Sequence, residues 1–208
     1  AADWTEDNGN WYYYDSYGDP LTDTWKKSGN DWYYLNSDGI RAYSQQVDEY
    51  YVNDEGKRVT YQWVSIENED YWNEDDAPEF LYYYYGKDGK ALTSTWASIN
   101  GSWYYFNGSG VMQTGWLKLS NSTYYLNGSG AMLTGWQSIG GKWYYLDGSG
   151  AMKTGWYRVG SNWYYSNPSG VMRYSTWIGD YYLLGDGRMA TNRWVGGYYV
   201  GADGKWVR

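Results

Sequence analysis

The sequence predicts an all-β fold, a solenoid or superhelix of consecutive β-hairpin repeats, and three observations support this prediction. A short pattern returns every 20 or 21 residues from Trp96 onward. Each copy contains a run rich in Trp and Tyr, residues that favour the pleated surface of a strand. Dipeptides such as Gly140-Gly141 and Asn100-Gly101 precede these runs, and they are the strongest local signal for a hairpin turn because they accept positive φ.

Each of the four most regular copies begins at a tryptophan and ends in a three-residue motif, Gly-Ala-Met or Gly-Val-Met. Their first residues are Trp96, Trp116, Trp136 and Trp156. A fixed period of this size is typical of arrays whose units bury their apolar faces only against their neighbours. We therefore expect the function to lie between repeats rather than in a single pocket.

Degraded copies extend the array to both ends of the sequence, giving ten units. Trp4/Trp11, Trp25/Trp32 and Tyr43/Tyr50 keep the seven-residue spacing between two aromatics, whereas Trp63 and Tyr82 are separated by a 12-residue insertion. Trp177 and Trp194 open shortened units, as expected of repeats that cap a stack. We divide the array into degenerate repeats (1–60), an irregular repeat with an acidic insertion (61–95), regular repeats (96–176) and shortened capping repeats (177–208).

Composition excludes several classes of function. The 16 Trp and 29 Tyr supply the core, since each buried ring removes roughly 150–250 Å² from water. Cys and His are both absent, which removes disulfides, thiolate metal sites and the commonest general base. No apolar run is long enough to span a membrane, and a net charge of −8 argues against nucleic acid and suits cationic ligands. We expect no catalytic residues, no metal and no cofactor, and hence no enzyme.

The repeated aromatic residues predict a cage. Two Trp seven residues apart lie on the two strands of one hairpin, and a Tyr of the next hairpin can close a third side. Methionines recur beside these rings, at Met112, Met132, Met152 and Met172, and offer a soft apolar floor. Electron-rich faces without a fixed charge suit a cation that cannot donate hydrogen bonds, which means a quaternary ammonium.

The run TGWxxxxGxWYYLxxxGxM, seen at 134–152 and closely matched at 154–172, resembles the choline-binding repeats of Gram-positive surface proteins and cell-wall hydrolases. The resemblance implies a hairpin superhelix that holds choline or phosphocholine on teichoic and lipoteichoic acids, outside the cell and on its wall. It also allows the chain to be the binding module of a larger hydrolase.

In that family each site takes two Trp from one hairpin and a Tyr from the next, often with a Met. Carried over, the choline ligands are Trp96, Trp103 and Tyr124; Trp136, Trp143 and Tyr164; Trp156, Trp163 and Tyr181; Trp4, Trp11 and Tyr33; Trp25, Trp32 and Tyr51; with Met132 and Met172. Thr123 replaces the second Trp of its unit, so the position between Trp116 and Tyr144 is expected to be weak or empty.

Two other readings stay open. Similar aromatic repeats occur in glucan-binding domains, where the rings stack on sugars. The polar turns at Asn107, Asn127 and Asn167 are compatible with a glucan-binding module. A surface adhesin could instead contact a host protein through the acidic insertion. The carboxylates of Glu67–Asp76 are irregularly spaced, so we interpret them as a solvated loop rather than a hydrolytic carboxylate pair or a calcium site.

Overall fold

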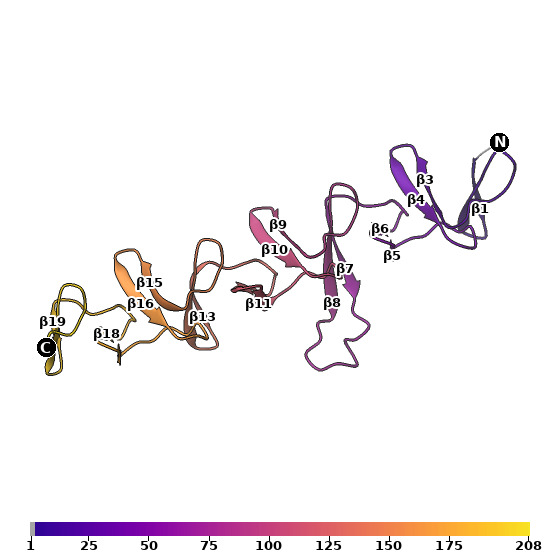
Figure 1. Cartoon of the computed structure of the whole chain (residues 1–208). Coiled ribbons are helices and arrows are strands. Elements are labelled where there is room, and N and C mark those ends of the chain that lie inside the picture. The colour runs from indigo at the N-terminus through magenta and orange to yellow at the C-terminus, as the bar shows by residue number, and fades with distance from the viewer. Residues whose placement is uncertain (1–2) are drawn as a thin grey trace. The chain divides into compact units, whose positions relative to one another are not determined.

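The computed structural model describes residues 3–208 as twenty β-strands, with no helix in that range and therefore none that could cross a membrane (Figure 1). The strands form ten two-stranded antiparallel sheets, and each sheet joins two strands that are consecutive in the chain. The predicted fold class, all-β with consecutive hairpin repeats, is confirmed.

The strands are short, from three to six residues. The first five hairpins are β1 (Asp3–Asp7) and β2 (Asn10–Tyr14); β3 (Thr24–Ser28) and β4 (Asp31–Leu35); β5 (Gln45–Val47) and β6 (Tyr50–Val52); β7 (Gln62–Glu67) and β8 (Phe80–Tyr85); β9 (Thr95–Ile99) and β10 (Ser102–Phe106). The last five are β11 (Gly115–Leu119) and β12 (Ser122–Leu126); β13 (Gly135–Ile139) and β14 (Lys142–Leu146); β15 (Gly155–Val159) and β16 (Asn162–Ser166); β17 (Thr176–Ile178) and β18 (Tyr181–Leu183); β19 (Arg193–Val195) and β20 (Tyr198–Val200).

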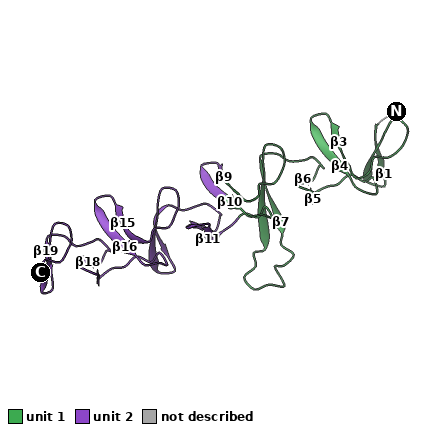
Figure 2. Cartoon of the chain, in the orientation of Figure 1, with its two compact units in different colours: residues 1–97, 105–112 green, residues 98–104, 113–208 purple. Residues whose placement is uncertain are grey.

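These hairpins fall into two compact units (Figure 2). The first unit comprises residues up to 97 together with 105–112, and it holds β1 to β8. The second comprises 98–104 and 113–208, and it holds β11 to β20. Strands β9 and β10 contribute residues to both.

The hairpin turns follow from the dipeptides between the strands. Gly140 and Gly141 have φ of 60° and 78°, and Asn8 and Gly9 have φ of 50° and 81°. Two successive positive φ angles are those of a type I′ turn, whose twist matches that of the flanking strands. In these hairpins the dipeptide therefore sets the register of the pair, for example Ser138 opposite Trp143.

The third hairpin differs from its predicted form. Tyr43 lies before β5, and the short strands pair Gln46 with Tyr51 and Val47 with Tyr50. The predicted pairing of Tyr43 with Tyr50 as the two aromatic ends of this unit is therefore wrong. Each strand of this hairpin is two residues shorter at the turn than the strands of β13–β14, so an equal sequence spacing does not mean an equal place in the strands.

The twelve-residue insertion forms the loop 68–79 between β7 and β8, and it extends beyond the strands (Figure 1). Ser65 pairs with Tyr82 across this hairpin, so Tyr82 occupies the position that Trp143 holds in the regular hairpin β13–β14. Asn68 closes the base of the loop by donating its Nδ2–H to the carbonyl of Pro78 over 2.8 Å. Because the register of the strands is unchanged, the insertion leaves the repeat pattern intact on both sides.

A turn follows every hairpin and returns the chain to the end of the second strand. The last residue of that strand forms an isolated bridge with the residue six positions later, as Leu146 does with Met152. The side chain of Asp147 holds the turn by accepting backbone N–H groups of Ser149 and Ala151 at 2.9 and 3.1 Å. We call the second partner of each bridge the bridge position; its occupants are Pro20, Arg41, Arg58, Ala91, Met112, Met132, Met152, Met172, Met189 and Trp206.

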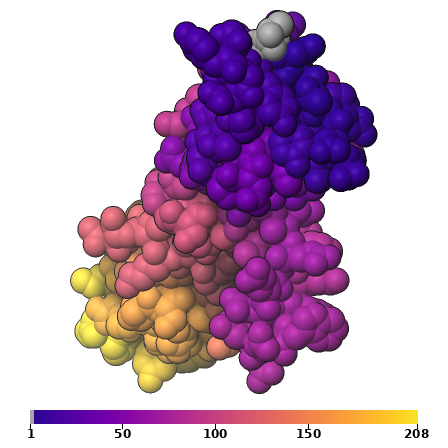
Figure 3. Space-filling model, turned by 90° about the vertical axis from the view of Figure 1, so that its right-hand side faces the viewer, coloured from indigo at the N-terminus to yellow at the C-terminus, as the bar shows by residue number. Residues whose placement is uncertain are grey.

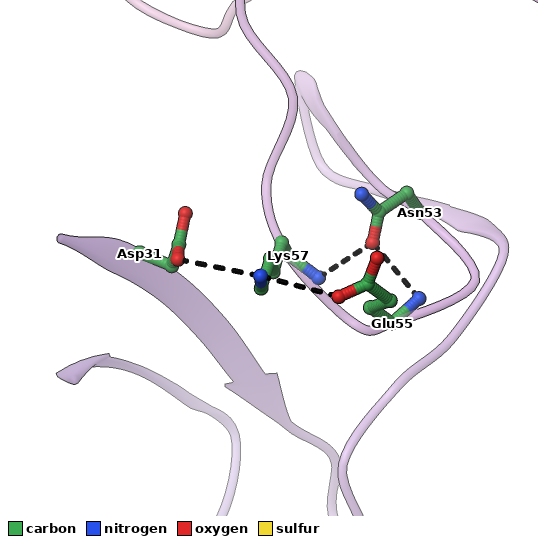
Figure 4. A network of polar contacts seen from close by, with 4 residues as sticks. All are labelled: Asp31, Asn53, Glu55 and Lys57. Carbon is green, nitrogen blue, oxygen red and sulfur yellow. Dashed lines mark hydrogen bonds and ion pairs between the residues drawn. The ribbon is translucent and has the colours of Figure 1, made fainter. Parts of the chain in front are cut away.

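Figure 4 shows one such turn in the first unit. The side-chain oxygen of Asn53 accepts the N–H groups of Glu55 and Lys57, both at 2.9 Å. The Lys57 ammonium lies 3.1 Å from Glu55 and 3.8 Å from Asp31 on β4. These charges are largely exposed, so the ion pairs contribute little to stability, but they mark where the turn meets the preceding hairpin.

Neighbouring hairpins are joined by backbone hydrogen bonds and by a small core. The N–H of Arg41 donates to the carbonyl of Trp11 over 2.9 Å, and that of Met172 to Trp143 over 2.8 Å. Leu35 and Leu146, the last residues of their strands, are fully buried. In the space-filling view, the residues of the first hairpins, drawn in indigo, lie against one another at the surface (Figure 3). Each compact unit therefore has small cores at the junctions between its hairpins.

Candidate functional site

The hairpin register places the two Trp of a repeat on the same face. In β13–β14, Ser138 pairs with Trp143, and Trp136 lies two residues before Ser138. Side chains two residues apart on a strand point to the same side, so the Trp136 and Trp143 rings face a common space diagonally across the hairpin. The turn between the strands leaves the outer side of Trp143 uncovered, and 47% of this residue is exposed.

The next hairpin and its turn complete the enclosure. The ring of Tyr164 on β16 meets that of Trp136 edge to face, with centroids 4.9 Å apart and planes at 65°. Met172 is fixed at the junction by its backbone hydrogen bond to Trp143. All four residues line a hollow of about 810 Å³. We call this set, Trp136, Trp143, Tyr164 and Met172, the Trp136 cage; the structure brings its predicted members together.

A second cage of the same construction lies one repeat further on. Trp156 and Trp163 face a hollow of about 280 Å³ that Tyr181 and Met189 also line. The Trp156 and Tyr181 centroids are 5.4 Å apart at 70°, and Trp163 is 42% exposed. This Trp156 cage gathers all three aromatic residues that the sequence predicts for it.

The incomplete repeat forms an enclosure with fewer aromatic walls. Trp116 and Tyr144 meet edge to face at 4.8 Å, and together with Thr123 and Met152 they line a hollow of about 320 Å³. Thr123 stands where the other cages have their second Trp, so this Trp116 cage has two aromatic walls instead of three.

The predicted set Trp96, Trp103 and Tyr124 draws its members from both compact units, and it stays a prediction. Within the second unit, Met132 donates its backbone N–H to the carbonyl of Trp103 over 2.8 Å. Met132 therefore has the same relation to Trp103 that Met172 has to Trp143.

The first unit builds its cages differently. Trp4 and Tyr33 meet edge to face at 5.4 Å, and the guanidinium of Arg41 lies against the predicted rings. Its central carbon is 4.1 Å from the centroid of Trp4, 5.3 Å from Trp11 and 4.4 Å from Tyr33. The Trp4 cage is thus assembled as predicted, but a side chain of the protein occupies it.

The second cage of this unit repeats the arrangement and corrects one predicted residue. The ring that meets Trp25, at 5.4 Å, is Tyr50 and not the predicted Tyr51. Tyr51 contacts Tyr85 instead. The cause is the shortened third hairpin, in which Tyr50 lies two residues before the buried Val52, as Tyr144 lies two before Leu146. The Arg58 guanidinium carbon is 5.1 Å from Trp25, 5.0 Å from Trp32 and 4.3 Å from Tyr50.

A further enclosure at the last junction was not predicted. Trp177 and Tyr198 are 5.9 Å apart, and Tyr198 and Trp206 are 5.2 Å apart, both edge to face. Together with Asp180 and Arg208 they line a hollow of about 460 Å³. Asp180 replaces the second Trp and accepts two hydrogen bonds from Arg208, at 2.9 and 3.1 Å. The third ring comes from Trp206 at the bridge position.

Two acidic residues lie beside the open cages. Asp186 lines the hollow of the Trp136 cage and Asp203 that of the Trp156 cage. Burial, and to a lesser degree the Asp186 carboxylate, raise the pKa of the Tyr164 hydroxyl, so this ring stays neutral at physiological pH. Asp186 is paired with Arg188 over 2.6 Å, which offsets its charge. Asp203 makes no ion pair within residues 3–208, and its negative charge favours a cation at the mouth of the Trp156 cage.

Sequence reasoning overlooked Tyr50, Met189, Trp206 and the two cage arginines, although most left a readable signal. Met189 follows Gly187 by two residues, as Met172 follows Gly170. Arg41 and Arg58 follow Gly39 and Gly56 by the same distance. Aligning the repeats on these glycines identifies the bridge position, and counting back from Gly56 identifies Tyr50.

Comparison with known families agrees with this geometry. One model of the choline-binding repeat matches twice, at residues 92–134 and 133–177, and a second model of this repeat matches residues 171–206. A model of a cell wall binding repeat matches residues 23–40. The choline-binding domain of CbpL from Streptococcus pneumoniae is 35% identical, with a TM-score of 0.70 over 88% of this chain and 96% of that domain. The chain belongs to the choline-binding repeat family.

Two other proteins of the same organism are similar over nearly the whole chain. CbpF, in its complex with ipratropium, is 37% identical over 95% of this chain and 63% of its own, with a TM-score of 0.66. The autolysin LytC is 29% identical with a TM-score of 0.74, and the chain spans only 46% of its length. A search of curated protein sequences found no significant match.

Proposed function

We propose that the chain is a non-catalytic module that attaches to the cell wall by binding choline, as phosphocholine on teichoic and lipoteichoic acids, in the aromatic cages between its hairpins. The observation that carries this proposal is the Trp136 cage. It combines three aromatic walls, a methionine floor and an exposed Trp143 around one open hollow. The module would act outside the cell, on its own or as part of a larger cell-wall hydrolase.

The chemistry of the cage favours a quaternary ammonium over a primary one. Ring faces and a thioether attract positive charge but are poor hydrogen-bond acceptors, so they cannot replace the water that a primary ammonium holds with its three N–H groups. A trimethylammonium group has no such donors to satisfy. Its methyl groups also bury apolar surface against Trp143, which water otherwise covers.

The arginine-filled cages of the first unit support a cationic ligand. There, the same arrangement of two Trp and one Tyr surrounds the guanidinium of Arg41. Glucan stacking remains the alternative, because exposed Trp faces also suit sugars. Its argument from polar turns is weakened, since the side-chain oxygens of Asn107, Asn127 and Asn167 accept backbone N–H groups of their own turns.

Affinity for a single choline should be weak and attachment strong. Three rings at roughly 0.5–2 kcal/mol each, reduced by the cost of immobilising the ligand, correspond to about millimolar dissociation constants. A polymer with repeated phosphocholines would engage several cages, and the effective concentration of the linked groups would then raise the overall affinity.

Titration with choline, ethanolamine and dextran, followed by Trp fluorescence and melting temperature, tests the proposal. Choline at millimolar concentration should change the fluorescence and raise the melting temperature, because it binds only the folded state. Ethanolamine at equal concentration should do less. Flat signals up to about 100 mM choline, far above the affinity estimated from cation–π energies, would reject choline binding, and a response to dextran alone would establish the glucan alternative.

A further inference from the structure

Both complete cages of the first unit already contain a positive charge. In the Trp4 cage the Arg41 guanidinium carbon lies within 5.3 Å of three ring centroids, and in the cage of Trp25, Trp32 and Tyr50 (the Trp25 cage) Arg58 lies within 5.1 Å of all three. These distances are within the range of about 6 Å for cation–π attraction. The arrangement recurs in two successive repeats, so it belongs to the repeat pattern of this unit.

Arg41 occupies the place that methionine has in the open cages. The backbone N–H groups of both Arg41 and Met172 donate to the carbonyl of the second Trp of the cage, Trp11 and Trp143. Their side chains also follow the same path. A Cβ on Gly56 would meet the Arg41 Cδ at 2.9 Å, and a Cβ on Gly187 would collide with the Met172 sulfur. The two residues are therefore structurally equivalent, but the side chain of Met172 ends in a neutral thioether and that of Arg41 in a positively charged guanidinium.

The charge of Arg41 is held by rings rather than by carboxylates. Within residues 3–208 the ion pairs are made by Lys57, Lys90, Arg188 and Arg208, and neither cage arginine takes part. The Nε of Arg41 is buried without a hydrogen-bond partner. A buried cationic nitrogen without an acceptor is costly unless something else stabilises it, and three aromatic faces are what surrounds it.

The arginines also cover the rings that the open cages leave bare. Trp143 and Trp163 are 47% and 42% exposed, whereas Trp11 and Trp32 are half-buried. Apolar ring surface that a ligand would shield in one unit is thus shielded by the chain itself in the other.

We propose that the bridge position decides whether a cage accepts an external cation: Arg41 and Arg58 act as built-in ligands that close the Trp4 and Trp25 cages, while methionine leaves a cage open to choline. This inference rests on the proposed choline binding. A tethered guanidinium has a high effective concentration at its cage, so a free ligand of millimolar affinity cannot displace it. The hairpins of these two cages therefore stack without choline.

The test compares four proteins by the number of cholines bound, from calorimetry and from crystals grown with choline. The variants are Arg41→Met, which should open the Trp4 cage and bind one choline more than the wild type, and Met172→Arg, which should close the Trp136 cage and bind one fewer. Arg173→Met is the matched control, since Arg173 is exposed and outside every cage, and it should bind the wild-type number. Circular dichroism verifies that each variant is folded.

The outcomes separate the two proposals. If the wild type binds choline, and folded Arg41→Met and Met172→Arg both bind the same number of cholines as the wild type, the bridge position does not have the proposed role. Choline binding itself would then still hold. No binding by the wild type would reject the proposed function, and this inference with it. If Arg41→Met folds only with choline present, that dependence supports the inference, because the added ligand then replaces the lost guanidinium.

Discussion

Tyr157 and Ser166 form a buried polar pair at a place where other hairpins carry a leucine. Ser166 is fully buried and corresponds to Leu126 and Leu146, and Tyr157 is 4% exposed. Their hydroxyl groups share a hydrogen bond of 2.6 Å, and the Tyr157 ring fills the volume that the smaller Ser166 leaves. We expect Tyr157→Phe to leave the Ser166 hydroxyl without a partner and to lower the free energy of unfolding by about 1–3 kcal/mol.

The same pair predicts a pH dependence. Burial raises the pKa of Tyr157 from 10.0 to about 12, although the hydrogen bond with Ser166 opposes part of the shift. The folded state therefore keeps the phenol proton longer than the unfolded state does. The stabilisation is complete below pH 10, falls as the pH rises from 10 toward 12, and amounts to roughly 2–3 kcal/mol at about 1.4 kcal/mol per pKa unit.

Urea unfolding at pH 8, 10 and 11.5, followed by Trp fluorescence, measures both effects. Other buried tyrosines also titrate, so the informative quantity is the difference between Tyr157→Phe and the wild type, which should shrink as the pH rises. Tyr165→Phe is the control, because the Tyr165 hydroxyl makes no hydrogen bond within the described residues. Adding Ser166→Ala to Tyr157→Phe should recover part of the loss. A Tyr157→Phe effect equal to that of Tyr165→Phe at every pH would refute the reasoning.

Three further predictions follow from the repeat geometry. Gly170→Ala should destabilise the protein by at least about 1–2 kcal/mol in urea unfolding, because Gly170 has a φ of 84° and a Cβ there would collide with the Met152 sulfur; Gly148→Ala, which has open space and no positive φ, should change it by less than about 0.5 kcal/mol. Thr123→Trp should add the missing wall of the Trp116 cage and raise the number of cholines counted by calorimetry by one, and an unchanged count would mean that this position is structural. Replacing the loop 68–79 with Asn-Gly should leave choline binding in the second unit unchanged, since repeats couple mainly to their neighbours; lost binding there would show that the loop is a structural support.

The repeat period and the turn dipeptides were enough to predict the hairpins, because both depend on residues close together in the sequence. The grouping of Trp136 with Tyr164 could also be predicted, since the family pattern carries it from one repeat to the next. The error at Tyr51 arose because spacing from the first aromatic was used in a hairpin that had been shortened. Counting from the buried Val52 would have avoided it, because the end of the second strand is the part that packing fixes.

The occupants of the cages were harder to predict than their walls. Taken alone, Arg41 has the sequence context of a surface charge after a turn, and its equivalence to the cage methionines becomes clear only when the repeats are aligned on their glycines. Its contacts with Trp4 and Tyr33 join segments far apart in the sequence. The role of Trp206 was not predicted for a similar reason. Its ring supplies the wall that is lost where Asp180 replaces the second Trp, but it comes from the bridge position of the next repeat.

The hollows of the Trp116, Trp136 and Trp156 cages are each lined by residues of three successive repeats, which constrains how such a chain can change in length. The Trp136 cage takes its Trp pair from β13–β14 and Tyr164 from β16, and Gly187, in the turn after β18, packs on its Met172. A deletion in one repeat therefore damages a site whose tryptophans lie two repeats earlier. Duplication of a whole repeat, by contrast, adds a finished site between surfaces that already match. The number of choline sites in such a chain should therefore increase in steps of one complete repeat. A single substitution of Met by Arg should close a site without shortening the protein.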